Sequence, residues 1–177
     1  MRIIAYVVAA LLLFTGCAQD QPKEPAPTAK PSPTATVPSM PAAAKENTVA
    51  GAVAFVEHYI DVFNYASNTG DVKELQKLSD PKCEGCTSYI DLYKKTYADG
   101  GYFRGSDWQF SEATVDTRDG ALVVFGHISA PSGVYKVRTA ANQQAGKTES
   151  FDATYLPFHA AIGWQITNFG KQETKPK

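Results

Sequence analysis

The apolar positions between residues 48 and 68 recur every three or four residues, which predicts one buried face of a helix: Val49, Val53, Val56, Ile60 and Phe63. Gly70 follows and predicts the helix end, because glycine readily adopts the left-handed conformation of a C-cap. Asp71 predicts the N-cap of a short second helix with Leu75 and Leu78 on its apolar face. A stripe of apolar and tyrosine side chains in residues 84–98 predicts a third helix.

After Gly101 the pattern changes to the alternation typical of strands. "WQFSEATV" alternates, "ALVVFGHIS" is almost continuously apolar as in a buried central strand, and Asp119-Gly120 between them predicts a hairpin turn. "VYKVRT" and residues 148–159 and 163–169 predict further strands, with Pro157 at a bend or a sheet edge. Three helices followed by an antiparallel meander predict an α+β fold.

The N-terminal apolar run, from Ile3 to Phe14, is about 18 Å long as a helix, shorter than the ~30 Å core of a bilayer. It is therefore typical of a signal peptide. Its end, Leu13-Phe14-Thr15-Gly16-Cys17, resembles the bacterial lipobox, although Phe14 replaces the preferred Leu. This resemblance implies cleavage after Gly16 and a diacylglyceryl group on Cys17, which would anchor the protein at the outer face of the cell membrane. The alternative is an ordinary secretory signal followed by a free cysteine.

Composition divides the rest of the chain. Residues 1–16 are predicted as the signal peptide and 17–46 as the lipidated cysteine with a disordered tether, because Pro, Ala, Thr and Ser dominate and no apolar period is present. Residues 47–170 are predicted as one domain and 171–177 as a flexible tail. The formal net charge is −1 and no Lys/Arg cluster stands out, so the sequence predicts no nucleic-acid partner.

Cys83 and Cys86, in "SDPKCEGCTSY", have a spacing that also serves redox pairs and zinc sites. Zinc would need two more ligands, and the three histidines are scattered. A redox pair is expected after a strand of a βαβ unit, whereas this pair follows a helical segment. In an oxidising compartment the favoured interpretation is a structural disulfide at the start of the third helix. No metal or other cofactor is predicted.

The segment "FNYASNTGDVKELQKLSDPKCEGC", with the Tyr-rich helix and "GGYFRGSDW" after it, resembles a family of actinobacterial lipoproteins whose domain has no assigned function. The "NTGD" corner resembles the nuclear-transport-factor-two-like superfamily, which includes SnoaL-like and ketosteroid-isomerase-like proteins. The resemblance implies a curved antiparallel sheet that wraps a long helix to form a cone. It implies no reaction, because that fold hosts enzymes, binding modules and scaffolds alike.

Candidate site residues are aromatic. A pocket is predicted from side chains that combine an apolar body with a polar tip: Tyr59, Tyr65, Tyr89, Tyr93 and Trp108. For an isomerase-like site, which needs a carboxylate base inside an apolar pocket, the candidates are Asp152 and Glu112, while Asp61 is predicted to face solvent. His58 is predicted on a helix surface and His127 in the core. The Ser-His-Asp arrangement is not indicated by the spacing of these residues along the chain.

The sequence predicts a membrane-anchored lipoprotein whose domain binds a small apolar ligand or an envelope protein without turnover. One alternative is a SnoaL- or isomerase-like enzyme acting on a small apolar substrate. The other is a structural envelope protein, with the cone filled by its own side chains. A carboxylate and a donor converging inside the cone would favour the enzyme.

Overall fold

The computed structural model describes residues 35–172. A short 3-10 helix, Ala43–Lys45, precedes three α-helices: α1 (Val49–Thr69), α2 (Lys73–Lys77) and α3 (Glu84–Ala98). Seven strands follow: β1 (Tyr102–Arg104), β2 (Gln109–Arg118), β3 (Ala121–Ala130), β4 (Val134–Lys136), β5 (Gln144–Ala145), β6 (Glu149–Ala160) and β7 (Gly163–Lys171). None of the helices among the described residues is long and apolar enough to span a membrane. The predicted signal peptide and Cys17 lie outside this range, as does most of the predicted tail.

The helices form where the sequence predicts them. The Thr48 hydroxyl caps α1 by accepting a hydrogen bond from the Gly51 amide at 3.0 Å, and Gly70 closes it with a φ of 76°. The prediction for Asp71 was wrong by one position. Helix α2 is preceded by Val72 at its N-cap, while the Asp71 carboxylate accepts from the Lys73 amide at 3.2 Å in a turn just before the helix.

The strands form two antiparallel sheets, one of four strands in the order β2-β3-β6-β7 and one of three in the order β1-β4-β5. Asp119 and Gly120, both with positive φ, make the predicted turn between β2 and β3. The pairing of β6 with β7 shifts between Leu156 and Pro157, and the pairing of β6 with β3 ends at Tyr155. The predicted bend and edge position of Pro157 are therefore both confirmed.

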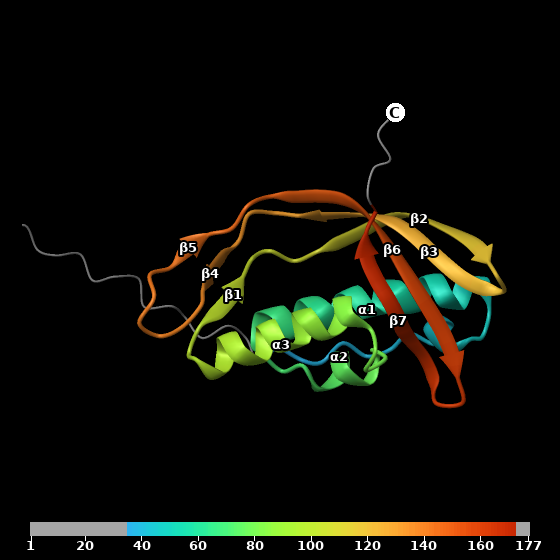
Figure 1. Cartoon of the computed structure of the whole chain (residues 1–177), viewed down its shortest axis with the longest axis horizontal. Coiled ribbons are helices and arrows are strands. Elements are labelled where there is room, and N and C mark those ends of the chain that lie inside the picture. Colours follow the sequence, from blue (N-terminus) through green and yellow to red (C-terminus); the bar gives the residue numbers. More distant parts are fainter. Residues whose placement is uncertain (1–34, 173–177) are drawn as a thin grey trace, which may run out of the picture. The chain divides into compact units, whose positions relative to one another are not determined.

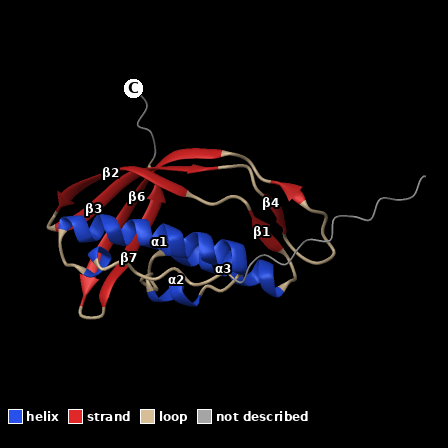
Figure 2. Ribbon diagram, turned by 180° about the vertical axis from the view of Figure 1, so that it is seen from behind, coloured by secondary structure: helices blue, strands red, loops and turns tan. Residues whose placement is uncertain are grey.

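The helices cover one face of the four-stranded sheet, and the small sheet, formed by β1, β4 and β5, lies to one side of it (Figures 1 and 2). The core between them joins fully buried side chains of α1, such as Phe55 and Val62, to Ile128 of β3, Tyr155 of β6 and Ile166 of β7. The α+β class is confirmed. The protein's own side chains fill the space between α1 and the sheet, with aromatic rings such as Tyr59 and Tyr155 among them.

The domain begins earlier than predicted. Ala44, which the sequence placed in a disordered tether, is fully buried, and the carbonyl of Glu46 accepts a 3.1 Å hydrogen bond from the Trp164 indole nitrogen. A Cβ on Gly51 would overlap that carbonyl, so the close contact depends on glycine. The prediction failed because this contact uses a small side chain and backbone atoms, which leave no apolar period in the sequence.

Candidate functional site

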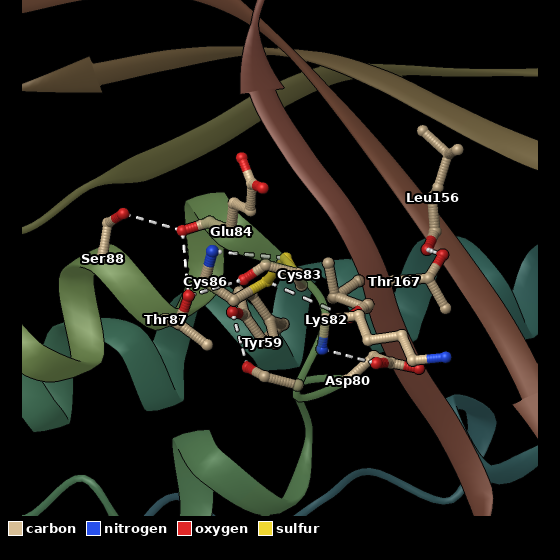
Figure 3. The surroundings of a disulfide bond; sticks show 12 residues. Tyr59, Asp80, Lys82, Cys83, Glu84, Cys86, Thr87, Ser88, Leu156 and Thr167 are labelled. Carbon is tan, nitrogen blue, oxygen red and sulfur yellow. Dashed lines mark hydrogen bonds between the residues drawn. A yellow bond between two sulfur atoms is a disulfide. The ribbon is translucent and has the colours of Figure 1, made fainter.

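Cys83 and Cys86 form a disulfide at the start of α3 (Figure 3). Both are about 1% exposed, and the Cys83 sulfur also accepts a 3.2 Å hydrogen bond from the Cys86 amide at the N-cap. Burial against the sheet leaves neither sulfur open to a reaction partner. Among the described residues, no group of three or more His, Cys, Asp or Glu side chains is placed to hold a metal. The disulfide thus belongs to the scaffold.

The loop before the disulfide binds β7. The Asp80 amide donates to the Ile166 carbonyl at 2.9 Å, and the Ile166 amide donates to the Leu78 carbonyl at 2.8 Å. The hydroxyls of Tyr59 and Ser79 lie 2.9 Å apart within the core. These bonds hold α1, the loop and β7 together and fix the position from which α3 starts.

A cavity of about 350 Å³ lies between α1, α3 and the small sheet. Six aromatic side chains dominate its lining: Phe63, Tyr89, Tyr93, Phe103, Trp108 and Tyr135. Leu92 adds an apolar side chain that is 44% exposed, and Lys147 and Glu149 supply the two charged groups of the lining. The arrangement is that of a small-molecule pocket, with an apolar wall and few polar groups.

Hydrogen bonds to Asn64 fix the position of Trp108 in this wall. The Asn64 side chain binds its backbone twice, because the Asn64 amide nitrogen donates to the Trp108 carbonyl and its oxygen accepts from the Trp108 amide, both at 2.8 Å. The indole packs on Phe63 at 4.4 Å and on Tyr89 at 5.5 Å between ring centroids. Asn64 thus ties the chain before β2 to α1 and sets the back of the cavity.

Tyr59 in the core and Tyr89 and Tyr93 in the cavity wall stay neutral at physiological pH. Burial raises the pKa of Tyr89, with a smaller contribution from the charge of Glu149, and burial likewise raises the pKa of Tyr93. Burial raises the pKa of Tyr59 to about 12, partly offset by its hydrogen bond with Ser79. Their hydroxyls can therefore donate hydrogen bonds, but they cannot serve as bases near neutral pH.

The structure brings together three of the five predicted pocket residues. Tyr89, Tyr93 and Trp108 line the cavity. Tyr59 lies in the core against Ser79, and the Tyr65 hydroxyl turns toward Asp71 at 3.5 Å, so neither lines it. Phe63, Phe103 and Tyr135 line the cavity but were not among the predicted pocket residues; Phe63 did stand in the apolar stripe of the first helix, as an expected core residue.

The candidate carboxylates do not enter the cavity. Asp61 is exposed, as predicted, and Glu112 and Asp152 are exposed on the strands of the large sheet. Glu149 lies at the cavity lining and pairs with Lys171 at 3.5 Å. Among the described residues, no carboxylate is buried in an apolar pocket opposite a donor, which is the arrangement that an isomerase-like site requires.

Both histidine predictions were wrong. His58 is only 2% exposed instead of lying on the helix surface, because α1 is covered on one side by the sheet and on another by α2 and the N-terminal segment. His127 is half-buried instead of lying in the core, since it occupies an outward position of β3 between the buried Gly126 and Ile128. A continuous apolar stretch hides this alternation.

His127 takes part in a polar network that the sequence analysis missed. Its Nδ1 lies 2.9 Å from Oδ1 of Asp152, and its Nε2 lies 2.9 Å from Oγ of Ser150. The contacts depend on the register of β3 with β6, which pairs His127 with Asp152 directly. The spacing of Ser150 and Asp152, two residues apart, indicates that their side chains share one face of a strand. The pairing of this strand with β3, which brings His127 to them, could not be predicted from that spacing.

Three solved structures show similarity to this chain, and the first of them, with a TM-score above 0.5, supports the fold. The intermembrane-space region of the chloroplast protein ARC6 superposes with a TM-score of 0.55 at 16% identity, over 73% of this chain and 99% of that one. An NTF2-like protein with a cystatin-like fold from Novosphingobium aromaticivorans has a TM-score of 0.39 at 13% identity, over 66% and 77% of the two chains. A protein of the NTF2-like family from Streptomyces avermitilis has a TM-score of 0.42 at 14% identity, over 70% and 97%.

None of the curated proteins matches this sequence. A family model does match, over residues 23–168, which is most of the chain and includes every helix and nearly all of the strands described above. The chain therefore belongs to DUF6318, a family of unknown function.

Proposed function

We propose that this protein is a lipid-anchored extracytoplasmic module that binds a small apolar ligand in the aromatic cavity, without turning it over. The observation that carries the proposal is the cavity itself, with a volume of about 350 Å³ lined chiefly by six aromatic side chains and Leu92. Such a volume suits a small ligand, and the wall supplies apolar contact with only a few polar groups to orient it.

Among the described residues, the wall of this cavity holds no buried carboxylate, which favours binding over catalysis. The carboxylate in its lining, Glu149, is paired with Lys171, and burial holds Tyr89 and Tyr93 in their neutral form. A ligand would gain apolar contact with the rings and hydrogen bonds from hydroxyl donors. A second hollow, of about 690 Å³, lies between the β6–β7 hairpin and the N-terminal segment, but it lacks such a ring of aromatic side chains.

The test is titration of the full chain with a panel of small apolar molecules, followed by calorimetry and tryptophan emission. Binding should saturate with a negative heat-capacity change, because apolar surface is removed from water. The emission of the Trp164→Phe variant, which retains Trp108, should change when a ligand binds. The emission of the Trp108→Phe variant, which retains Trp164, should not change. A panel that leaves both heat and emission unchanged would contradict the proposal.

A rim variant separates the cavity from general effects on the fold. Leu92→Asp places a charge at the cavity lining from a half-exposed position, so affinity should fall about tenfold or more while the protein remains folded. Val49→Asp is the matched control, since Val49 is also an exposed apolar helix residue but does not line the cavity. Equal affinity in both variants would place the ligand elsewhere.

A further inference from the structure

We propose that Ser150, His127 and Asp152 form a nucleophile, base and orienting group that together hydrolyse small carboxylic esters. The imidazole is held at both nitrogens, with Oδ1 of Asp152 at 2.9 Å from Nδ1 and Oγ of Ser150 at 2.9 Å from Nε2. This is the order of contacts by which a serine hydroxyl is activated: the carboxylate orients the ring, and the opposite nitrogen faces the hydroxyl.

Strand register explains why these three side chains meet. His127 of β3 stands directly opposite Asp152 of β6, and Ser150 is two residues along β6, on the same face of the sheet. The residues between and beside them point the other way, where Phe151 packs on Trp108 at 5.4 Å. The network and the aromatic cavity therefore belong to opposite faces of one sheet, and this inference goes beyond the ligand-binding function.

The Ser150 hydroxyl is positioned to react because it is exposed, whereas its partner His127 is half-buried and bonded on both sides. The helices cover the other face of the sheet, so a substrate can approach from solvent (Figure 2). Holding the imidazole from both sides fixes which nitrogen faces the serine, and this positioning is what separates a base from a freely rotating surface histidine.

Hydrolysis of the ester proceeds in two steps, acylation of Ser150 and then deacylation. Oγ of Ser150 attacks the ester carbonyl carbon while Nε2 of His127 takes the hydroxyl proton; the bond to the leaving oxygen breaks, and that oxygen receives the proton as an alcohol. Water then attacks the acyl-serine and gives a proton to Nε2. The bond from the acyl carbon to Oγ breaks, a carboxylic acid leaves, and the proton returns to Oγ.

The charged side chains near His127 favour substrates of one charge over another. A hollow of about 190 Å³ borders His127 and Asp152, although not Ser150, and is also lined by Glu112, which stands at a bulge of β2 with a φ of 56°. Two carboxylates beside the base disfavour an anionic ester, so the predicted substrates are neutral or cationic. The network faces solvent, so the acceleration is expected to be modest compared with that of an enclosed site.

The first test uses a fluorophosphonate probe on the full chain, with the adduct located by peptide mass spectrometry, and p-nitrophenyl acetate as the ester. Ser150 should carry the adduct, and Ser150→Ala should abolish labelling and ester turnover. Ser129→Ala is the matched control, because Ser129 stands opposite Ser150 in the register but has no bond to His127. An adduct elsewhere, or turnover that persists in Ser150→Ala, would overturn the proposal.

The second test addresses the supporting groups. His127→Gln should slow labelling of Ser150 by about tenfold or more, the low end of what a positioned base contributes. Asp152→Asn should slow it as well, and Asp152→Glu should restore part of the rate, since a carboxylate can again reach Nδ1. Thermal unfolding should first show that each variant is folded. Equal labelling rates in all these variants would then refute the catalytic role.

Discussion

At the scale of single residues, His58 links stability to pH. Its Nδ1 is buried without a hydrogen-bond partner among the described residues, and burial lowers the pKa of the imidazole, although the charges of Asp61 and Glu74 act in the opposite direction. The unfolded chain, with an ordinary histidine pKa near 6.5, therefore binds a proton at a pH where folded His58 does not. The folded state loses stability as the pH falls below about 6.5.

This dependence can be measured by urea unfolding at a series of pH values. His58→Leu should flatten the fall in the free energy of unfolding between about pH 6.5 and 5, because the group that titrates is gone. Asp61→Asn should steepen it, because removing the carboxylate lowers the pKa of folded His58 further. If the His58→Leu protein shows the same slope as the unmodified chain, another group governs the response.

At the scale of elements, the start of α3 depends on Gly85. A Cβ at this position would overlap the Phe169 carbonyl oxygen of β7, so the helix and strand approach more closely than any other residue allows. Gly85→Ala should lower the free energy of unfolding by about 1–3 kcal/mol, the usual cost of overpacking. Ser88→Ala, an exposed position on the same helix, should change it by less than about 0.5 kcal/mol in the same urea titration.

The disulfide should contribute less than its buried position suggests. It closes a loop of only four residues, so the entropy that it removes from the unfolded chain is worth about 2 kcal/mol. The variant with Cys83→Ala and Cys86→Ala should fold with a free energy of unfolding lower by about that amount. In the unmodified protein, alkylation after denaturation without reductant should label neither cysteine, and labelling of both would contradict the bond.

The elements that the sequence predicts well are those with a local signal. Gly70 marks the end of α1 by capping chemistry, and Asp119-Gly120 marks the β2–β3 hairpin by turn chemistry. Part of the cavity wall could be predicted from the sequence, because Tyr89 and Tyr93 have a helical spacing. The network of Ser150, His127 and Asp152 could not be predicted, since it depends on the pairing of residues that lie more than twenty positions apart in the sequence.

At the scale of the whole molecule, the boundary of the folded unit is testable. Because Ala44 is buried and Glu46 binds Trp164, limited proteolysis should trim the N-terminus only to a point before Pro41, and not to Asn47 as the composition predicted. Mass spectrometry of the resistant fragment gives the boundary directly. A fragment that starts at residue 47 or later would show that this segment detaches in solution.

The proposed membrane anchor rests on Cys17. The variant Cys17→Ser lacks the thiol that would accept the diacylglyceryl group, so the protein should be released into the medium or remain as an uncut precursor. Fractionation of expressing cells, with immunodetection of the chain, distinguishes these products from the membrane-bound form. Mature Cys17→Ser protein found in the membrane fraction would contradict the lipidation.

Strand β6 pairs with β3 along one part of its length and with β7 along another, and this affects how the sheet unfolds locally. Residues 149–155 of this strand pair with β3, whereas 153–160 pair with β7, so beyond Tyr155 the hairpin has no support from the central strand. Its hydrogen bonds to the rest of the domain include those with the Leu78 and Asp80 backbone and with the carbonyls of Lys77 and Glu46. Amide hydrogens of residues 158–165 should therefore exchange as a separate cooperative unit, faster than those of β3.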